Sequence, residues 1–248
     1  MRTVTATRYV TPLREGGSLP GLVEADDDGL YVLKFRGAGQ GSRALVAEVV
    51  CGELARALGL PVPEQVLIEL DPALGHAEPD PEIQELIAAS AGTNLGVDFL
   101  PGSLAFAPPC LEHVTPERAA DIVFFDALVT NVDRTPRNPN LLLWHGQVWL
   151  IDHGAALYLQ HTGNDLAAMA GRPFPMIRDH VLLAHAGASG EAAERLAPRV
   201  TRELLAELLE LVPAAWLEPA ARAGYVAYLA ARAAAAPRVA AEIEAART

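Results

Sequence analysis

Residues 131–152 constrain this chain more than any other stretch, because they place polar and acidic side chains around a short hairpin. Residues 131–140 are polar and interrupted by prolines, which predicts a loop rather than a helix or strand. The apolar runs 141–144 and 148–151 flank a short turn, a pattern typical of a β-hairpin. Asp152 follows the second run directly. We therefore expect the loop and the end of the second strand to lie side by side.

Three side chains in this stretch match the needs of one kind of chemistry. Asp133 is followed five residues later by Asn138, and Asp152 lies 19 positions after Asp133. In phosphoryl transfer, one carboxylate orients the attacking hydroxyl and accepts its proton. An amide oxygen and a second carboxylate hold magnesium on the phosphates of ATP. The hairpin would let the three oxygen-bearing groups converge.

A simpler interpretation of the same stretch is a structural loop, because Asp, Asn, Pro and Arg are common turn residues. An aspartate that ends an apolar strand after a hairpin favours the chemical interpretation. Further support has to come from the N-terminal part of the chain.

The N-terminal part supplies a candidate cation, a candidate carboxylate and a glycine-containing turn. Lys34 interrupts an apolar strand, and Glu48 lies beside apolar residues on the next predicted helix, 43–58. A phosphate-binding cation needs a rigid strand and a carboxylate that holds it. Alternatively, both residues are solvated surface charges. The glycine-containing turn lies before the strand that carries Lys34 and does not match GxxxxGK[ST]. Its backbone N–H groups near Gly17 and Ser18 are nevertheless candidates to bind phosphates.

Strand and helix signals divide the chain into two parts. Residues 1–100 predict a small antiparallel sheet with one helix, and three prolines interrupt the pattern shortly afterwards. Residues 101–248 predict a mostly helical part that contains the loop and hairpin. The expected fold class is therefore α+β with two lobes.

The order of these motifs resembles the HipA-like kinases and, more distantly, the phosphoinositide kinases and eukaryotic-type protein kinases. The run Asn-x-Asp-Arg-x3-Asn over residues 131–138, with Arg137 just before the last Asn, is similar to the HipA catalytic loop. The helix that ends in Gly-Leu-Pro-Val-Pro at 59–63 is similar to the helix after that family's ATP-binding lysine. Residues 95–100 resemble the strand that leads into the hinge between lobes. The resemblance covers roughly residues 14–160.

The resemblance implies a two-lobed protein-kinase-like fold that uses ATP and Mg²⁺. The implied catalytic base is Asp133, and the implied magnesium ligands are Asn138 and Asp152. The implied ATP contacts are Lys34, held by Glu48, and the backbone at Phe99 and Leu100. The chain is shorter than a full HipA toxin and has no room for the toxin's N-terminal subdomain. A toxin–antitoxin role and DNA association are therefore not implied.

Charge and cysteine content exclude some classes of partner and site. The formal net charge of −12 argues against nonspecific nucleic-acid binding and makes an anionic membrane a poor partner. Cys51 and Cys110 are too few for a disulfide framework or a zinc cluster, so we expect two reduced, buried thiols. The chain shows neither a signal-peptide core nor an apolar run of about 20 residues that would span a bilayer. We expect a cytoplasmic protein.

Several single residues allow two interpretations. Arg134 either pairs with a nearby carboxylate and braces the loop or faces solvent. His153 either orients the loop at Asp152 or packs in the interior. His180 and His185 flank an apolar run and are expected at the surface or at helix ends.

The sequence thus predicts a kinase that transfers the γ-phosphoryl group of ATP to a hydroxyl group, with protein Ser or Thr among the candidate acceptors. One alternative is a catalytically silent nucleotide-binding module that acts through a partner. A second is AMP transfer on the same fold, and a third is an interaction scaffold built on the acidic surface and helical tail.

Overall fold

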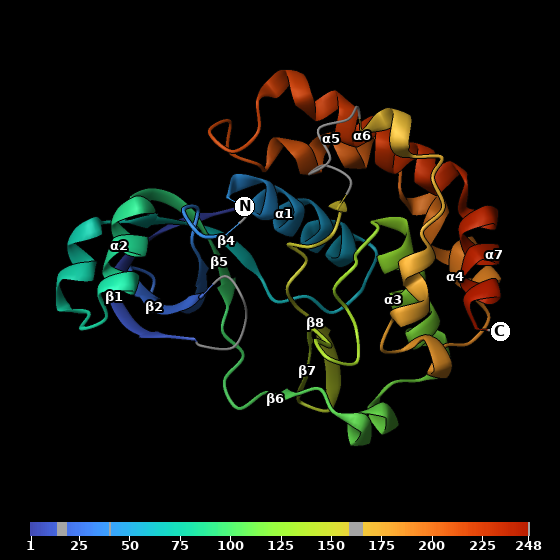
Figure 1. Cartoon of the computed structure of the whole chain (residues 1–248), viewed down its shortest axis with the longest axis horizontal. Coiled ribbons are helices and arrows are strands. Elements are labelled where there is room, and N and C mark those ends of the chain that lie inside the picture. The colour runs from blue at the N-terminus through green and yellow to red at the C-terminus, as the bar shows by residue number, and fades with distance from the viewer. Residues whose placement is uncertain (14–18, 40, 159–165, 248) are drawn as a thin grey trace. The chain divides into compact units, whose positions relative to one another are not determined.

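The computed structural model of the chain describes residues 1–13, 19–39, 41–158 and 166–247 (Figure 1). Contacts between residues divide the chain into two compact units, Met1–Leu45 with Pro63–Pro101, and Val46–Val62 with Gly102–Thr248. Residues 46–62, which the sequence-based division placed in the N-terminal part, group with the second unit by these contacts.

The first unit contains a closed sheet. Its strands are β1 (Thr3–Pro12), β2 (Gly21–Ala25), β3 (Leu30–Lys34), β4 (Gln65–Leu70) and β5 (Gly92–Asp98), arranged in the order β1-β2-β3-β5-β4. Neighbouring strands are antiparallel except β1 and β4, which pair in parallel and close the barrel. The expected small antiparallel sheet is therefore not confirmed, because the strands form a closed barrel with one parallel pair. The closing pair joins segments about 60 residues apart, and a hairpin pattern carries no signal for it.

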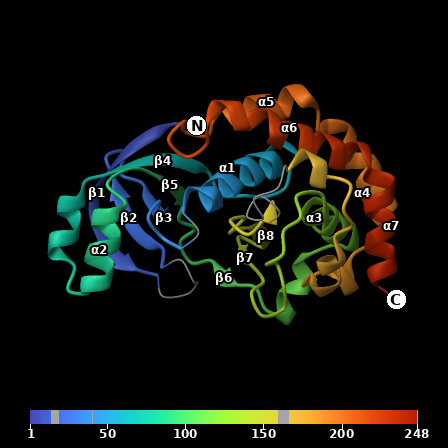
Figure 2. The same cartoon turned by 45° about the horizontal axis from the view of Figure 1, so that its top comes forward.

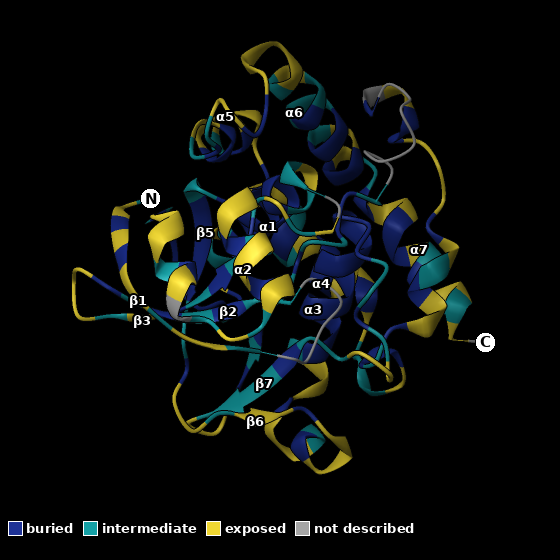
Figure 3. Cartoon of the chain, turned by 60° about the vertical axis from the view of Figure 1, so that its left-hand side comes forward, coloured by how far each residue is buried: buried dark blue, intermediate teal, exposed yellow. Residues whose placement is uncertain are grey.

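Alternating side chains fill the barrel. Val23, Tyr31, Leu33 and Ile68 are almost fully buried, as the period of two along a strand requires. The α2 helix (Pro81–Ala89) adds Ile83 and Ile87 to this core. Its outer face is exposed, as Figure 3 shows in yellow.

The segment 71–84 contains regular structure. It holds the 3-10 helix η1 (Pro72–Ala77) and the first turn of α2. Each of these helices starts with a capping aspartate followed by proline. The Asp71 carboxylate accepts the N–H of Ala73 at 2.8 Å, and the Asp80 carboxylate accepts the N–H of Glu82 at 3.0 Å.

The α1 helix (Ser42–Ala57) runs through residues that belong to both units. Gly59 ends it in a left-handed conformation with φ of +83°, which glycine adopts without steric cost. The guanidinium of Arg199 donates to the carbonyls of Ala57 and Leu58, at 2.6 and 2.7 Å. A cation thus satisfies the carboxyl end of this helix.

The second unit is mostly helical, as expected. It contains α3 (Pro116–Leu128), α4 (Ser189–Leu196), α5 (Arg202–Glu210), α6 (Pro219–Ala234) and α7 (Ala236–Ala246). Figure 2 shows α3 beside α4 and α7, which are its main helical contacts. Residues 119–128 of α3 are all buried, and Figure 3 shows this helix in dark blue. Short 3-10 helices connect these elements: η2 (Pro108–His113), η4 (Ala167–Met169), η5 (Pro175–Asp179), η6 (Leu183–His185) and η7 (Ala197–Arg199).

A small sheet in this unit holds the predicted hairpin. β7 (Leu141–Trp144) pairs with β8 (Gln147–Leu150), and β6 (Leu104–Ala105) adds a third, short strand. Trp144 and Trp149 pack edge to face across the hairpin, with ring centres 5.4 Å apart. The hairpin returns the chain from the loop at 131–140 to Asp152.

Two other sequence-based expectations concern the thiols and the membrane. Cys51 and Cys110 are unpaired and buried, as predicted. Among the described residues, none of the helices is both long enough and apolar enough to cross a bilayer.

Candidate active site

The loop after α3 folds into a tight turn that points one side chain back at another. Thr135 and Asn138 exchange two backbone hydrogen bonds, each of 3.1 Å, across the turn 135–138. Pro136 occupies the second position of this turn, where its fixed φ is favourable. The sequence Asp-Arg-Thr-Pro-Arg-Asn therefore brings the side chain of Asn138 back to Asp133.

Two asparagine side chains hold the Asp133 carboxylate. Asn138 Nδ2 donates to Asp133 Oδ2 at 2.7 Å, and Asn140 Nδ2 donates to the same oxygen at 3.3 Å. An ionised carboxylate only accepts hydrogen bonds, so the amide nitrogens must face it. The amide oxygens of Asn138 and Asn140 consequently point elsewhere and remain suited to a cation.

Partial burial raises the pKa of Asp133 above its usual value. The hydrogen bonds from Asn140 and Asn138 oppose this shift, while the nearby negative charge of Asp152 adds to it. Asp133 and Asp152 are therefore close enough to influence each other. The structure brings the sequence-predicted Asp133, Asn138 and Asp152 into one region.

Asp152 sits at the end of the hairpin in an unusual backbone conformation. Its φ is +55°, a left-handed geometry that Asp tolerates better than most residues. The preceding N–H, of Ile151, donates to the carbonyl of Asn140 at 3.1 Å, which ties the strand end to the loop. A left-handed aspartate at such a junction is the kind of local strain that is often found at functional sites.

The oxygen-bearing side chains fit a hard divalent cation. Carboxylate and amide oxygens are the ligands that Mg²⁺ prefers. The negative charge of Asp152 makes ionisation of Asp133 more costly, and a cation between the two carboxylates would offset that repulsion. A cluster of three or more His, Cys, Asp or Glu residues suited to a metal does not occur within the described ranges. Any metal here would therefore rely on asparagine as well as aspartate.

Glu48 on α1 is buried, not a solvated surface charge. Its Oε1 accepts the N–H of Gly154 at 2.9 Å, two residues after Asp152, and its Oε2 lies 4.0 Å from His153 Nδ1. His153 is also buried and packs edge to face against Phe125. Glu48 thus anchors the segment that follows Asp152. Its predicted pairing with Lys34 stays a prediction.

The remaining nucleotide candidates lie in the first unit. Lys34 is the last residue of β3, opposite Leu95 of β5, and is half-buried on the face away from the barrel core. The N–H of Phe99 donates to the carbonyl of Leu30 at 3.0 Å and so extends the pairing of β3 with β5 by one residue. Leu100 is buried. Gly17 and Ser18 lie outside the described residues.

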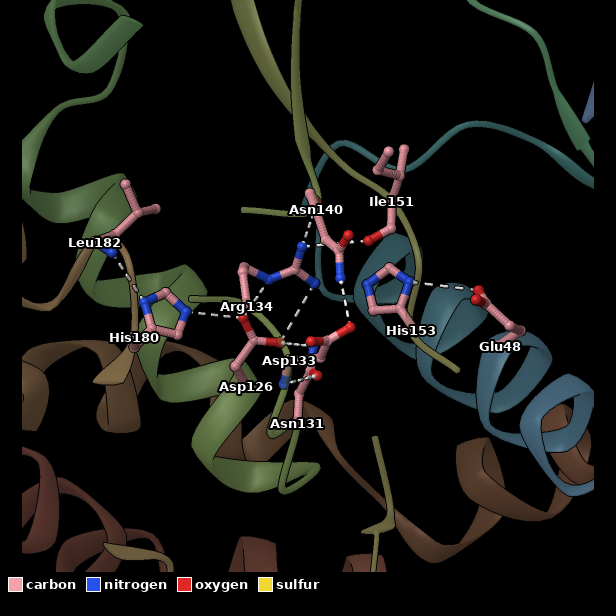
Figure 4. A network of polar contacts seen from close by, with 10 residues as sticks. All are labelled: Glu48, Asp126, Asn131, Asp133, Arg134, Asn140, Ile151, His153, His180 and Leu182. Carbon is pink, nitrogen blue, oxygen red and sulfur yellow. Dashed lines mark hydrogen bonds and ion pairs between the residues drawn. The ribbon is translucent and has the colours of Figure 1, made fainter. Parts of the chain in front are cut away.

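A buried polar network supports the loop, and sequence reasoning missed most of it (Figure 4). Asp126 on α3 accepts hydrogen bonds from Asn131 at 3.0 Å, Arg134 at 2.5 Å and His180 at 2.9 Å. Arg134 does pair with a carboxylate, which decides between the two interpretations of that residue. His180 is buried rather than exposed, and it lies directly after η5, which agrees with the helix-end position among the two that were expected. Asp126 lay inside an apolar helical run, and only its charge at a core position could have marked it.

Comparison with solved structures defines the class of fold. The Helicobacter pylori proinflammatory kinase CtkA matches with a TM-score of 0.58 at 14% identity, covering 97% of this chain and 99% of that one. The Golgi casein kinase matches with a TM-score of 0.57 at 14% identity, covering 100% and 76%. Its Mn/ADP-bound form matches with a TM-score of 0.56 at 14% identity, covering 100% and 75%. The fold is that of a kinase.

A model of the HipA-like kinase family matches residues 7–227. The chain therefore belongs to the HipA-like kinase family. A comparison with curated proteins found no match.

Proposed function

We propose that this chain is an ATP- and Mg²⁺-dependent phosphotransferase that moves the γ-phosphoryl group of ATP to the hydroxyl of a protein Ser or Thr. The observation that carries the proposal is the 2.7 Å contact between Asp133 and Asn138 beside the charge of Asp152. A kinase of the same fold was solved with Mn/ADP bound, which supports nucleotide and divalent-metal use here. The name casein kinase describes a protein substrate and motivates the proposed acceptor.

Asn138 and Asp152 would hold the divalent cation. Asn138 already directs its amide nitrogen at Asp133, so its oxygen is the atom left for a metal. When bound, the cation would neutralise negative charge on the phosphate oxygens. Asn140 presents its amide in the same way and is a further candidate oxygen donor.

Asp133 would act on the acceptor hydroxyl. Both asparagines donate to Oδ2, so we assign the hydroxyl to Oδ1. The hydroxyl oxygen forms a bond to the γ-phosphorus while the bond from that phosphorus to the β–γ bridging oxygen breaks. ADP leaves with the electron pair, and the hydroxyl proton passes to Asp133. Its raised pKa makes Asp133 a better proton acceptor than an ordinary aspartate.

Lys34 would contact the ATP phosphates, with Glu48 as its proposed carboxylate partner. It is the only lysine among 19 basic residues, and arginine serves at every other position. A compact ammonium on a strand suits a phosphate oxygen as a point charge. The adenine contact is proposed for the backbone around Phe99 and Leu100. Because the Phe99 N–H is engaged by the sheet, Leu100 is the better donor candidate.

The single lysine allows a direct test of nucleotide binding. An acyl-phosphate derivative of ATP transfers its acyl group to a lysine beside the bound phosphates. We expect mass spectrometry to find the label on Lys34, and excess MgATP to suppress it. Labelling that MgATP does not suppress would contradict the proposed site.

Turnover tests the catalytic assignment. Asp133→Asn is expected to lower Mg²⁺-dependent ATP turnover by about 10²–10⁴-fold, the usual range for loss of a positioned base. Asp179→Asn is the matched control, because that aspartate is exposed on η5. ATP binding without turnover in the wild type would identify a silent module. Product carrying AMP instead of phosphate would identify nucleotidyl transfer.

A further inference from the structure

Asp126 is a fully buried carboxylate that contacts three side chains from two segments, the loop 131–140 and the connection between η5 and η6. It lies on α3, where its neighbours are apolar core residues. Its partners are Asn131 just after the helix, Arg134 in the loop and His180 between η5 and η6 (Figure 4). A buried carboxylate is costly unless its oxygens are satisfied, and here three donors satisfy them.

One connection runs from Asp126 to the backbone of Asp133. Asn131 Nδ2 donates to Asp126 Oδ1 at 3.0 Å, which fixes the amide orientation. The Asn131 oxygen then accepts the N–H of Asp133 at 3.1 Å. The position of the Asp133 main chain is thus set by a side chain that Asp126 holds.

A second connection runs to the strand end that carries Asp152. Arg134 donates from Nε and Nη2 to the two oxygens of Asp126, at 2.5 and 3.4 Å. Its other nitrogen, Nη1, donates to the carbonyl of Asn140 and, at 3.3 Å, to that of Ile151. The planar guanidinium therefore fixes the loop and the residue before Asp152 with one rigid group.

A third connection brings in the segment around η5 and η6. His180 Nδ1 accepts the N–H of Leu182 at 3.0 Å, so the ring proton of the neutral imidazole lies on Nε2. Nε2 therefore donates to Asp126 at 2.9 Å. The next residue, Val181, donates its N–H to the Arg134 carbonyl at 3.0 Å. Two adjacent residues, His180 and Val181, thus contact Asp126 and the backbone of Arg134.

The network also keeps Asp126 charged. Burial by itself favours the neutral acid, but the positive charge of Arg134 and the hydrogen bond from His180 outweigh it. The pKa of Asp126 consequently lies well below its ordinary range. A permanent negative charge holds Arg134 at all ordinary pH values.

We propose that Asp126 is the positioning residue of this site. It fixes the position of Asp133 through Asn131 and that of Asp152 through Arg134, and His180 supplies the third side chain that holds Asp126 in place. The inference rests on the proposed function for its catalytic readout. Asp126 would touch neither nucleotide nor acceptor. Loss of its support would displace the two carboxylates relative to each other, while ATP contacts in the first unit would be unaffected.

The test compares variants at two histidines. His180→Leu removes the donor to Asp126, whereas His180→Gln keeps an N–H donor in reach of that carboxylate. His185→Leu is the matched control, because His185 donates to the Val114 carbonyl, outside the network. We expect His180→Leu to lower kcat for MgATP turnover by about 10–100-fold, as for loss of a residue that orients a ligand. KM for ATP should stay within about threefold, and His180→Gln should recover most of kcat.

Hydrogen exchange supplies a readout that does not depend on catalysis. The Asp133 N–H is held by Asn131, so a peptide covering 131–140 should exchange faster in His180→Leu than in wild type or His185→Leu. Asn131→Ala acts on the same carboxylate from the other side and should show the same two effects. Should His180→Leu fail to fold, Asn131→Ala decides the matter.

The outcomes separate this inference from the proposed function. Inactive wild-type protein with faster exchange in His180→Leu would reject the phosphotransferase and retain the positioning network. Active wild type whose kcat falls no further in His180→Leu than in His185→Leu would overturn the positioning role alone. Failure of His180→Gln to recover kcat would also overturn the positioning role, because the loss of kcat in His180→Leu would then not be due to the missing hydrogen-bond donor to Asp126.

Discussion

Arg134 shows how a charged side chain can occupy a core position. Its side chain and that of Asp126 are both fully buried, and the guanidinium meets two carboxylate oxygens and two carbonyls. Burying either charge alone would be very unfavourable, so each residue depends on the other. The neighbouring Arg137 has the same chemistry but lies exposed on the turn.

Replacement of Arg134 by Met should therefore destabilise the protein strongly. The substitution leaves Asp126 with an uncompensated negative charge, which typically costs about 3–5 kcal/mol. Arg137→Met, three residues along the same loop, should change stability by less than about 0.5 kcal/mol. Urea unfolding of the two variants measures both values. Equal losses would mean that burial of the pair contributes nothing specific to stability.

The proximity of Asp133, Asn138 and Asp152 could be predicted from the sequence because their spacing is local. A tight turn and a hairpin are short-range features, and both leave a clear residue pattern. Asp126 and His180 could not be found in this way. They lie 54 residues apart, and their contact depends on how η5 and η6 return to α3. Neither residue carries a motif of its own.

Gly96 allows the strands β4 and β5 of the barrel to approach closely. It lies opposite Val66 in the β4–β5 pair. A Cβ at this position would meet the side chain of Ile68 and would lie 2.9 Å from Cγ2 of Val66. Both neighbours are fully buried and have little room to move.

Gly96→Ala is accordingly expected to cost about 1–3 kcal/mol through overpacking of the barrel. Gly190→Ala on α4 makes the same chemical change at a position with no heavy atom within 4 Å. That control should be neutral or stabilising by up to about 1 kcal/mol, because Ala favours a helix. Thermal unfolding of the two variants tests the difference. A harmless Gly96→Ala would contradict the close approach.

The start of α4 depends on a residue from another helix. Its N-cap residue is Ala188, whose side chain makes no capping hydrogen bond. The carboxylate of Glu244 on α7 accepts the N–H of Ser189 at 2.9 Å instead. That hydrogen bond is the main reason that the pKa of Glu244 is lowered.

This contact makes a specific contribution to stability as a function of pH. Because the folded-state pKa lies below the ordinary value of 4.5, the contribution is fully present above that value. It is lost as pH falls through the lowered pKa. Glu244→Gln should lose about 0.5–1 kcal/mol at pH 7, and its deficit against wild type should shrink in acid. Glu207→Gln on α5 is the exposed control. A deficit that persists unchanged in strong acid would disprove the charge-dependent cap.

At the element scale, sequence patterns located the β7–β8 hairpin and the helix α1 to within a few residues. Each has a local signal: a short turn between two apolar runs marks the hairpin, and Gly59 follows α1. The parallel β1–β4 pair closes the barrel through long-range pairing, and no local pattern marks it. The capping of α4 by Glu244 is non-local for the same reason.

The whole molecule combines a barrel unit that holds the only lysine with a helical unit that holds Asp133, Asn138 and Asp152. In the proposed function, ATP needs groups from both sets of residues. Nucleotide binding should therefore stabilise the folded chain against global unfolding, because an unfolded chain does not bring these groups together.

A non-hydrolysable ATP analogue with Mg²⁺, supplied at about 100 times its Kd, should stabilise the folded protein by about 2.7 kcal/mol. For a chain of this size, that corresponds to a rise in Tm of roughly 5–10 °C. Asp152→Asn should reduce the part of the shift that depends on Mg²⁺, because it removes a carboxylate that we assign to the cation. Asp179→Asn, on the exposed η5 segment, should keep the full shift. Thermal unfolding with and without Mg²⁺ measures these differences, and an equal Mg²⁺-dependent shift in both variants would remove Asp152 from the proposed metal site.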